Sequence, residues 1–249
     1  MITLYDEPDH KVVMYDDLSQ GSMVQSNQLA VISKGECMVL DPGGHKVYSQ
    51  LFSMLAGIVP ASGLKHIFFS HQDPDIIAAA NGWLMVTDAT AYLSELWMRF
   101  IPHFGVDDLV VERIRPIPDE GAIIMVGGTP LKVIPAHFLH SSGNFQVYDP
   151  RSKTLLSGDL GASLGNDYWK VEDFDAHVKH MEGFHRRYMP STRAIKMWVT
   201  MARTLEIDRI APQHGAVFPS PEMSRRFIDW LDGLTVGVDL MDEGFRVPG

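Results

Sequence analysis

Six residues with metal-binding side chains stand at four separate places in the sequence. They are His71, Asp73, Asp75, His140, Asp159 and His214. Three imidazoles and three carboxylates are enough to hold two metal ions about one bridging carboxylate. Because the set combines imidazole nitrogen with carboxylate oxygen and includes no thiolate, it suits iron, manganese or zinc better than softer ions. The sequence therefore predicts a dinuclear metal site.

The segment His71-Gln72-Asp73-Pro74-Asp75 is suited to projecting several side chains in one direction. In an extended turn, alternate side chains point the same way, and proline at position 74 favours an extended conformation for Asp73. On a helix, side chains two residues apart would instead be splayed by about 200°. We therefore expect residues 71, 73 and 75 to lie on one side of a loop.

Each of the other three candidates lies in a loop that follows a predicted strand, beside small residues that allow tight turns. The pairs are strand 131–134 with His140, strand 154–156 with Asp159, and strand 209–211 with His214. Functional side chains are often placed in this way, on loops held by a rigid scaffold.

The remaining elements follow from the periodicity of apolar residues. Strands are predicted at 12–15, 29–32, 38–40, 67–69, 122–126, 131–134, 144–148, 154–156 and 209–211. Helices are predicted at 47–59, 91–100, 173–188, 193–206 and 221–231, with a helical turn at 76–80. Runs of strands with helices between them predict an α/β protein in which two mixed sheets pack together and helices lie outside. Without a repeat, a low-complexity linker or a break in composition, we expect one domain over residues 1–249.

Composition and charge narrow the classes of partner. The net charge of −10 and the pI near 5.5 argue against nucleic acid as a partner, because a phosphate-binding surface is basic.

Residues 1–9 have no basic segment followed by an apolar core, so no secretory signal is predicted. No apolar run is long enough to span a bilayer. The single cysteine, Cys37, lies in an apolar run and is expected to be buried. A cytoplasmic protein is expected.

The spacing of the candidate ligands resembles the signature of the metallo-β-lactamase superfamily. The similarity is to its di-iron branch, the flavodiiron proteins and the related oxygen-binding di-iron proteins. It covers nearly the whole chain and implies an αββα sandwich with the metals at the shared edge of the two sheets. The matching elements are His71-x-Asp73-x-Asp75, His140, Ser157-Gly158-Asp159 and Ala211-Pro-x-His214-Gly215.

The resemblance also implies a role for each ligand. Two iron ions are the expected cofactor, bridged by Asp159 and by an oxo, hydroxo or peroxo species, with zinc or manganese as the alternative. The implied ligands are His71, Asp73 and His140 for one ion, and Asp75 and His214 for the other.

Two positions depart from the family patterns. Hydrolases of the superfamily usually carry histidine where this chain has Asp73 and Ile76, and flavodiiron proteins usually carry glutamate at position 73. A carboxylate at 73 supplies charge that stabilises oxidised iron. Isoleucine at 76 leaves an open coordination position beside an apolar side chain, which suits an O₂ or NO site better than a hydrolytic cleft.

A further departure concerns electron supply. Flavodiiron proteins carry a C-terminal flavodoxin domain that binds FMN, whereas this chain ends 35 residues after His214. No flavodoxin domain and no FMN are therefore expected. An external redox donor would then have to deliver electrons for turnover of O₂.

Two functions remain open from the sequence. The first is a non-haem di-iron protein that either binds O₂ or NO as an oxygen or iron sensor, or binds and reduces it as a partner-dependent reductase. Its expected partners are a second copy in a homodimer, and either a redox donor or a signalling protein such as a chemoreceptor. The alternative is a dinuclear zinc or manganese hydrolase of phosphodiester, thioester or lactone substrates.

Several residues are expected near the site or on the surface without binding metal. Tyr188 and His137 are expected beside the ligands, and residues 21–27 are expected to form one wall of the pocket. Three histidines on the helix predicted at 173–188 indicate a solvated or interface face, namely His177, His180 and His185. An aromatic set is assigned to the core or to a dimer interface, namely Trp97, Phe100, Phe104, Tyr168 and Trp169.

Overall fold

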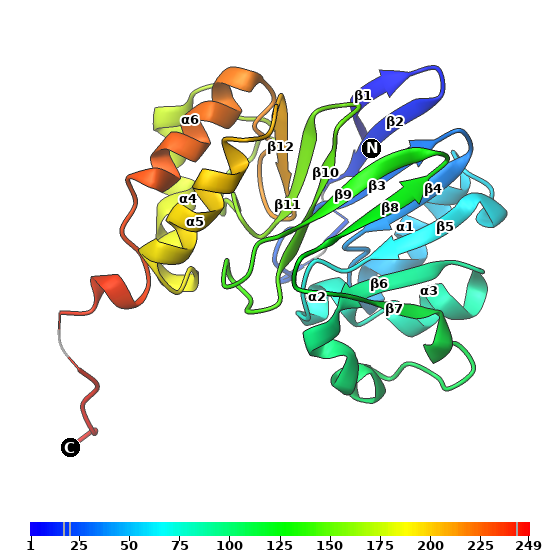
Figure 1. Cartoon of the computed structure of the whole chain (residues 1–249), viewed down its shortest axis with the longest axis horizontal. Helices are drawn as coiled ribbons and strands as arrows, with labels where there is room; N and C mark the ends of the chain where they lie inside the picture. The colour runs from blue at the N-terminus through cyan, green and yellow to red at the C-terminus, as the bar shows by residue number, and fades with distance from the viewer. Residues whose placement is uncertain (17, 20, 243) are drawn as a thin grey trace.

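Two β-sheets packed face to face form the centre of the molecule, and helices cover the outer face of each sheet (Figure 1). This computed structural model describes residues 1–16, 18–19, 21–242 and 244–249. The first sheet has seven strands in the order β1-β2-β3-β4-β5-β6-β7, and the second has five in the order β12-β11-β10-β9-β8. The αββα sandwich predicted from the sequence is confirmed.

The strands and helices have the following bounds. The strands are β1 Ile2–Glu7, β2 His10–Tyr15, β3 Gln28–Ser33, β4 Glu36–Leu40, β5 Leu64–Phe68, β6 Thr90–Ser94, β7 Ile114–Ile117, β8 Ala122–Val126, β9 Thr129–Pro135, β10 Phe145–Asp149, β11 Thr154–Gly158 and β12 Arg209–Pro212. The α-helices are α1 His45–Ala56, α2 Pro74–Ile77, α3 Ala80–Val86, α4 Phe174–Tyr188, α5 Thr192–Ala202 and α6 Pro221–Asp232. Short 3₁₀ helices are η1 Ala61–Gly63, η2 Glu95–Phe104, η3 Val111–Arg113 and η4 Val238–Leu240.

Three apolar layers hold the sandwich together, and strand alternation assigns each side chain to its layer. On β2, Val13 packs against helices α1 and α3, whereas Val12 and Met14 point the other way, into the layer between the sheets. The third layer lies under α4, α5 and α6 and includes Leu155 of β11 and Ile210 of β12. Both sheets are therefore buried on two faces over much of their length.

The ends of strands from both sheets meet at one edge. β4 to β7 run parallel in the first sheet, and β11 pairs in parallel with β12 in the second. The amide N–H of Phe145 donates to the carbonyl oxygen of Ser70 (3.0 Å), and that of Gln213 donates to Gly158 (2.8 Å). These bonds join the loop after β5 to β10, and the loop after β12 to β11. The loops that carry the candidate ligands are thus fixed to one another.

The prediction of a helix at 91–100 is wrong. Residues 90–94 form strand β6, in parallel register between β5 and β7, and the 3₁₀ helix η2 follows. Ala91 and Leu93 are fully buried while Thr90 and Tyr92 are only half-buried, which is the two-residue period of a strand. Ser94 ends the strand, because its Oγ accepts from Leu96 N–H and starts the turn.

Two further strands were not predicted, and some element ends differ. β1 is an edge strand with acidic residues and an irregular register, and β7 carries Arg115 and Pro116 on its exposed positions. Neither has the apolar alternation on which the sequence prediction depended. The helical turn predicted at 76–80 is instead α2 followed by α3, and α5 ends at Ala202, before the predicted 206.

The prediction that the histidines of α4 form a solvated or interface face is also wrong. His177 and His185 are fully buried, while His180 is half-buried with its Nδ1 3.0 Å from the carbonyl oxygen of Leu164. His177, Met181 and His185 follow one another at intervals of four residues, so they share the core-facing side of the helix. Burial lowers the pKa of both His177 and His185 to about 4.

Buried neutral histidines make the fold sensitive to acid. Below pH 6.5 the unfolded chain takes up a proton at His177, whereas the folded chain does so only near pH 4. Stability is therefore present above pH 6.5 and is lost as the pH falls from 6.5 to 4, by roughly 2–3 kcal/mol for this residue. We expect His177→Phe to lose that much less stability between pH 7.5 and 4.5, measured by urea unfolding. Replacement of the exposed His103 by Gln is the control, and an equal loss in wild type and His177→Phe would contradict the prediction.

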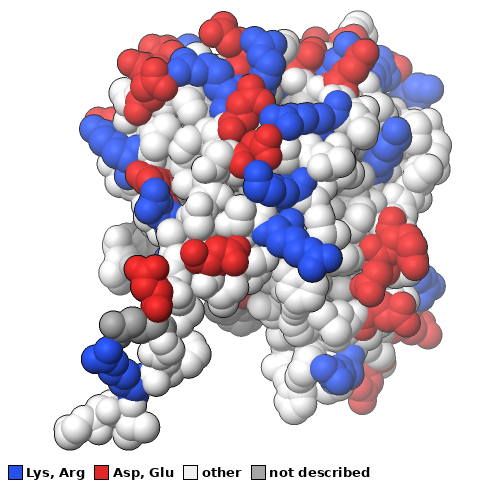
Figure 2. Space-filling model, turned by 60° about the vertical axis from the view of Figure 1, so that its left-hand side comes forward, with Lys and Arg blue, Asp and Glu red and all other residues white. Residues whose placement is uncertain are grey.

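Charges are interspersed on the helical face of the molecule. Figure 2 shows basic and acidic side chains interspersed over the upper part of this face. Arg203 pairs with Asp229 (2.9 Å), and Arg226 with Asp175 (2.6 Å). Within the described residues, no helix has the length and apolar character needed to cross a membrane.

Candidate metal centre

The six predicted ligands come together at the edge where the two sheets meet. His71, Asp73 and Asp75 follow β5 in the first sheet, with Asp73 immediately before α2. The second sheet supplies the rest, from the loops after β9, β11 and β12, namely His140, Asp159 and His214. The alternate spacing of 71, 73 and 75 therefore places three side chains toward residues that lie far away in the sequence.

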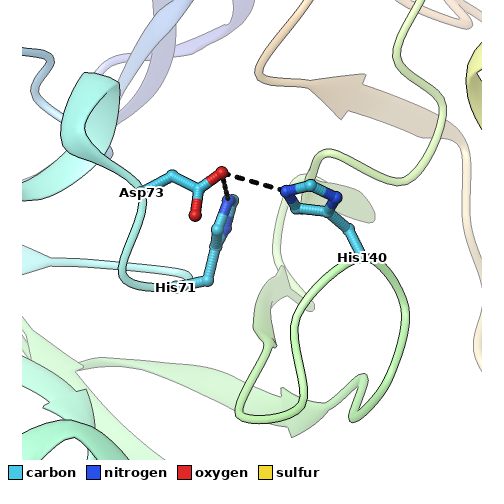
Figure 3. Close-up of side chains that lie close together, drawn as sticks. All are labelled: His71, Asp73 and His140. Atoms are coloured by element: carbon cyan, nitrogen blue, oxygen red, sulfur yellow. Dashed lines mark hydrogen bonds and ion pairs between the residues drawn. The ribbon is translucent and has the colours of Figure 1, made fainter. Parts of the chain in front are cut away.

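One group of donor atoms forms around Asp73. Its Oδ2 lies 3.0 Å from Nε2 of His140 and 3.6 Å from Nε2 of His71 (Figure 3). The ligand atoms of these three residues all lie within 4.8 Å of one another. Two imidazoles and one carboxylate oxygen thus converge on a single point.

Asp159 stands between this group and a second one. Its Oδ2 is 3.6 Å from Nε2 of His140, and its Oδ1 is 3.9 Å from Nε2 of His71. The same Oδ1 is 3.7 Å from Nε2 of His214, whose Nε2 is also 3.4 Å from Oδ2 of Asp75. The carboxylate of Asp159 therefore contacts imidazoles of both groups, as a bridging ligand does.

The donor set fits metal ions. Metal bonds to imidazole and carboxylate are about 2.0–2.2 Å long, which places neighbouring donors of one ion roughly 3 Å apart. The observed separations of 3.0 to 3.9 Å are close to that. Nε2 of His71 and Oδ1 of Asp159 are also buried with no hydrogen-bond partner in the described part of the chain. Unpaired buried polar atoms are costly, and a metal ion would satisfy both.

The far sides of two imidazoles are held by hydrogen bonds. Nδ1 of His214 lies 2.6 Å from the carbonyl oxygen of Gln25, so it must donate, and Nε2 is left free to bind metal. Nδ1 of His71 lies 2.9 Å from Oγ of Ser70, whose own N–H donates to the buried carboxylate of Asp41 (2.7 Å). Burial raises the pKa of Asp41 to about 6.

Charges within the cluster shift its titration. The hydrogen bond from His140 and then the nearby imidazole of His71 hold the pKa of Asp73 well below its usual value. Burial lowers the pKa of His71, but the nearby carboxylates of Asp73 and Asp159 outweigh burial and raise the pKa to about 9. An imidazole held in this way binds a cation strongly, because a metal ion supplies the positive charge that the carboxylates favour.

His140 adopts an unusual backbone conformation. Its φ is +73°, in the left-handed region that residues other than glycine rarely enter. The turn is stabilised from both sides, because Phe138 N–H and Asn144 N–H both donate to the carbonyl oxygen of Ser141 (2.9 and 3.2 Å). Strain of this kind is often retained where it orients a functional side chain.

The three residues expected near the ligands lie in different surroundings. The ring of Tyr188 lies 5.5 Å from that of His140 and stacks on Phe184 (4.8 Å), with about half of its surface exposed. Ile76 is fully buried in the core layer beneath α1 and α3. Nε2 of His137 lies 2.9 Å from the carbonyl oxygen of Asp119. Of the three, Tyr188 is thus the residue whose ring contacts the imidazole of a candidate ligand.

The loop expected as a wall of the metal pocket lines a cavity that reaches Gly215, next to His214, but includes none of the six candidate ligands in its lining. Val24, Gln25 and Asn27 form one side of a cavity of about 600 Å³, which is closed on other sides by residues 163–169 and Gly215. Gln25 Oε1 accepts from Gly215 N–H (2.7 Å), so this wall also holds the His214 loop in place. Tyr168 and Trp169, assigned from the sequence to core or interface, are part of the same cavity and partly exposed.

Sequence reasoning missed several residues that support the ligands. Asp41 was not among the predicted site residues, although it accepts a hydrogen bond from Ser70 N–H beside His71 and has a φ of +46°. Gln72 and Ser141 contact the site through side-chain hydrogen bonds. Their only signal in the sequence is that each adjoins a candidate ligand.

A site of this kind at the shared edge of an αββα sandwich defines a protein of the metallo-β-lactamase fold, in its di-iron branch. The chain belongs to the ODP family, because the family model described as "ODP family beta lactamase" matches residues 24–215. It is similar to the chemotaxis sensor ODP solved as a peroxy di-iron species, with 41% identity, a TM-score of 0.87, and coverage of 96% of this chain and 97% of that one. It is likewise similar to the apo state of the chemotaxis sensor ODP from T. denticola, with 39% identity, a TM-score of 0.86 and 96% coverage of both chains.

More distant similarity shows the fold alone. A flavo di-iron protein from Thermotoga maritima has 18% identity and a TM-score of 0.76, and the match covers 93% of this chain and 60% of that one. Rubredoxin oxygen:oxidoreductase from Desulfovibrio gigas has 11% identity and a TM-score of 0.77, with 93% and 61% covered. No curated protein sequence matches the chain.

Proposed function

We propose that this chain is a non-haem di-iron sensor that binds O₂ and passes the signal to a partner protein. The observation that carries the proposal is the convergence of six donors about Asp159 in a chain 41% identical to a chemotaxis sensor with a peroxy di-iron species. When bound, two ferrous ions supply the electrons with which O₂ is captured. The remaining steps depend on the chain's own residues.

The protein holds and orients the ions. In the proposed arrangement His71, Asp73 and His140 would hold one ion, Asp75 and His214 would hold the other, and Asp159 would be shared. The carboxylates bring three negative charges to the site, which would favour a more highly charged metal ion there. Hydrogen bonds from His214 to Gln25 and between His71 and Ser70 fix the imidazole planes.

The surroundings support gas binding better than hydrolysis. Ile76 offers no metal donor at a position where hydrolases of the superfamily carry histidine, and it is fully buried. Tyr188 and Phe184 place stacked aromatic rings beside His140. A small apolar ligand such as O₂ or NO tolerates such walls, whereas a hydrolase needs a polar cleft for its substrate and water.

The output of the proposed sensor is a protein contact. Because two similar structures are chemotaxis sensors, we infer a signalling protein such as a chemoreceptor as the partner, with the sensor in the cytoplasm as a homodimer. In this proposal O₂ capture is the signal rather than the first step of continuous turnover. An external redox donor would be needed only to reset the site.

Metal content and optical absorption under anaerobic conditions test the proposal. We expect about two irons per chain after loading with Fe²⁺, and a new visible charge-transfer band when air is admitted. A band that decays slowly supports a sensor, and rapid decay with an added electron donor supports a reductase instead. Binding of two zinc ions, no optical change with iron, and turnover of phosphodiester, thioester or lactone substrates would overturn the proposal in favour of a hydrolase.

A further inference from the structure

The side chain of Asp73 lacks the hydrogen bond that its position would normally give it. Asp73 is the N-cap residue of α2, where an aspartate usually accepts from a backbone N–H of the first turn. No such bond is formed, and Pro74 at the first helical position has no N–H to offer. The carboxylate is therefore oriented by something other than its own helix.

A neighbouring side chain takes this role. Nε2 of Gln72 donates to Oδ1 of Asp73 (2.9 Å), and Oε1 of Gln72 accepts from Oγ of Ser141 (2.6 Å). Ser141 is buried and directly follows His140, whose Nε2 is 3.0 Å from the other oxygen of Asp73. Three hydrogen bonds and the peptide bond between residues 140 and 141 thus form a closed ring that joins the loop after β5 to the loop after β9.

The direction of every hydrogen bond in this ring is determined by the carboxylate. Ionised Asp73 can only accept, so Gln72 must present its NH₂ group to Oδ1. The amide oxygen of Gln72 is then turned toward Ser141, whose hydroxyl must donate. One oxygen of Asp73 is occupied, and the other, Oδ2, faces His71 and His140.

We propose that Gln72 and Ser141 are positioning residues that form a clamp on Asp73. The clamp keeps Oδ1 engaged so that Asp73 presents one oxygen to the metal, and it sets the spacing between the two loops that supply this ion. Without it the carboxylate is free to rotate and to offer either oxygen or both. The inference rests on the proposed function only to the extent that the site binds metal.

Metal binding by clamp variants tests the proposal. Gln72→Met keeps the length of the side chain but removes both hydrogen bonds, and Ser141→Ala removes one. We expect Gln72→Met to weaken binding of one of the two ions about 10- to 100-fold, as loss of a supporting hydrogen bond commonly does, with the other ion little changed. Fe²⁺ affinity is measured anaerobically by competition with a chelator.

Three further measurements separate positioning from a general effect on the fold. Co²⁺ bound in place of iron should show shifted d–d absorption bands in Gln72→Met, because the carboxylate binds differently. The double variant should bind no more weakly than Gln72→Met alone, since both substitutions break one connected unit. Ser141→Thr keeps a hydroxyl and should restore nearly normal affinity and bands.

Matched controls are available on the surface. Ser142 and Gln50 are exposed, so Ser142→Ala and Gln50→Met should bind both ions as the wild type does. Two ions bound by Gln72→Met with unchanged affinity and unchanged Co²⁺ bands would overturn the clamp. Failure of the wild type to bind Fe²⁺ or Co²⁺ would instead overturn the proposed metal site itself. If Gln72→Met does not fold, the Ser141→Ala and Ser141→Thr pair gives the same decision.

Discussion

Replacement of Asp159 by alanine is expected to abolish binding of both metal ions, rather than of one. Asp159 is almost fully buried, and its two oxygens contact His71, His140 and His214, which come from both halves of the site. Without Asp159, the three imidazoles remain, but the negative charge shared by the two groups is lost, and that charge is what would hold two cations close together. Metal analysis after anaerobic loading should show a fall from about two ions per chain to near zero.

The control for this variant lies in the same stretch of chain. Asp167 is exposed, so Asp167→Ala removes an equal charge without touching the site and should keep both ions. Circular dichroism should show the same secondary structure in both variants. Retention of one tightly bound ion by Asp159→Ala would contradict the bridging role, and would place Asp159 as a ligand of a single ion.

Replacement of Gly215 by alanine is expected to destabilise the protein by more than about 3 kcal/mol. Gly215 directly follows His214 and has a φ of +78°, which costs other residues about 1–2 kcal/mol. A Cβ there would lie 1.9 Å from Oγ and 2.4 Å from the carbonyl oxygen of Ser163. Relief of that clash must move either the His214 loop or the segment after Asp159. Urea unfolding of the metal-free protein measures the loss.

Another glycine separates the clash from the backbone effect. Gly165 has a φ of +73°, close to that of Gly215, but no atom lies within 4 Å of the position of its Cβ. Gly165→Ala should therefore cost only the backbone term, about 1–2 kcal/mol. Equal losses in the two variants would show that the contact with Ser163 contributes nothing.

The candidate ligands, which the structure brings together, could be proposed from the sequence because the pattern around each of them is local. Each candidate follows a short apolar strand and adjoins glycine, serine or proline, so its position at a sheet edge follows from the pattern alone. The prediction failed where tertiary pairing decides the structure. Residues 90–94 carry both a strand and a helix pattern, and only pairing with β5 and β7 selects the strand.

The residues that hold the candidate ligands in place were harder to predict than the candidate ligands themselves. Gln25 holds His214 from almost 190 positions away, and Ser141 bonds to Gln72 across 69 positions. No local pattern reports such pairs. The buried state of His177 and His185 was missed for a related reason, because a polar side chain on an amphipathic helix is ordinarily assigned to solvent.

The division of the ligands between the two sheets has a consequence for assembly. Neither the first 120 residues nor the rest contains a complete site, since His71, Asp73 and Asp75 belong to one part and His140, Asp159 and His214 to the other. In the proposed site, metal would therefore act as a cross-link that forms only after the halves have docked, and it would stabilise the docked state by RT ln(1 + [metal]/Kd). Separately produced halves should each bind iron weakly, yet iron should promote their reassociation. The metal ions of the proposed sensor would thus also link its two halves and stabilise their association.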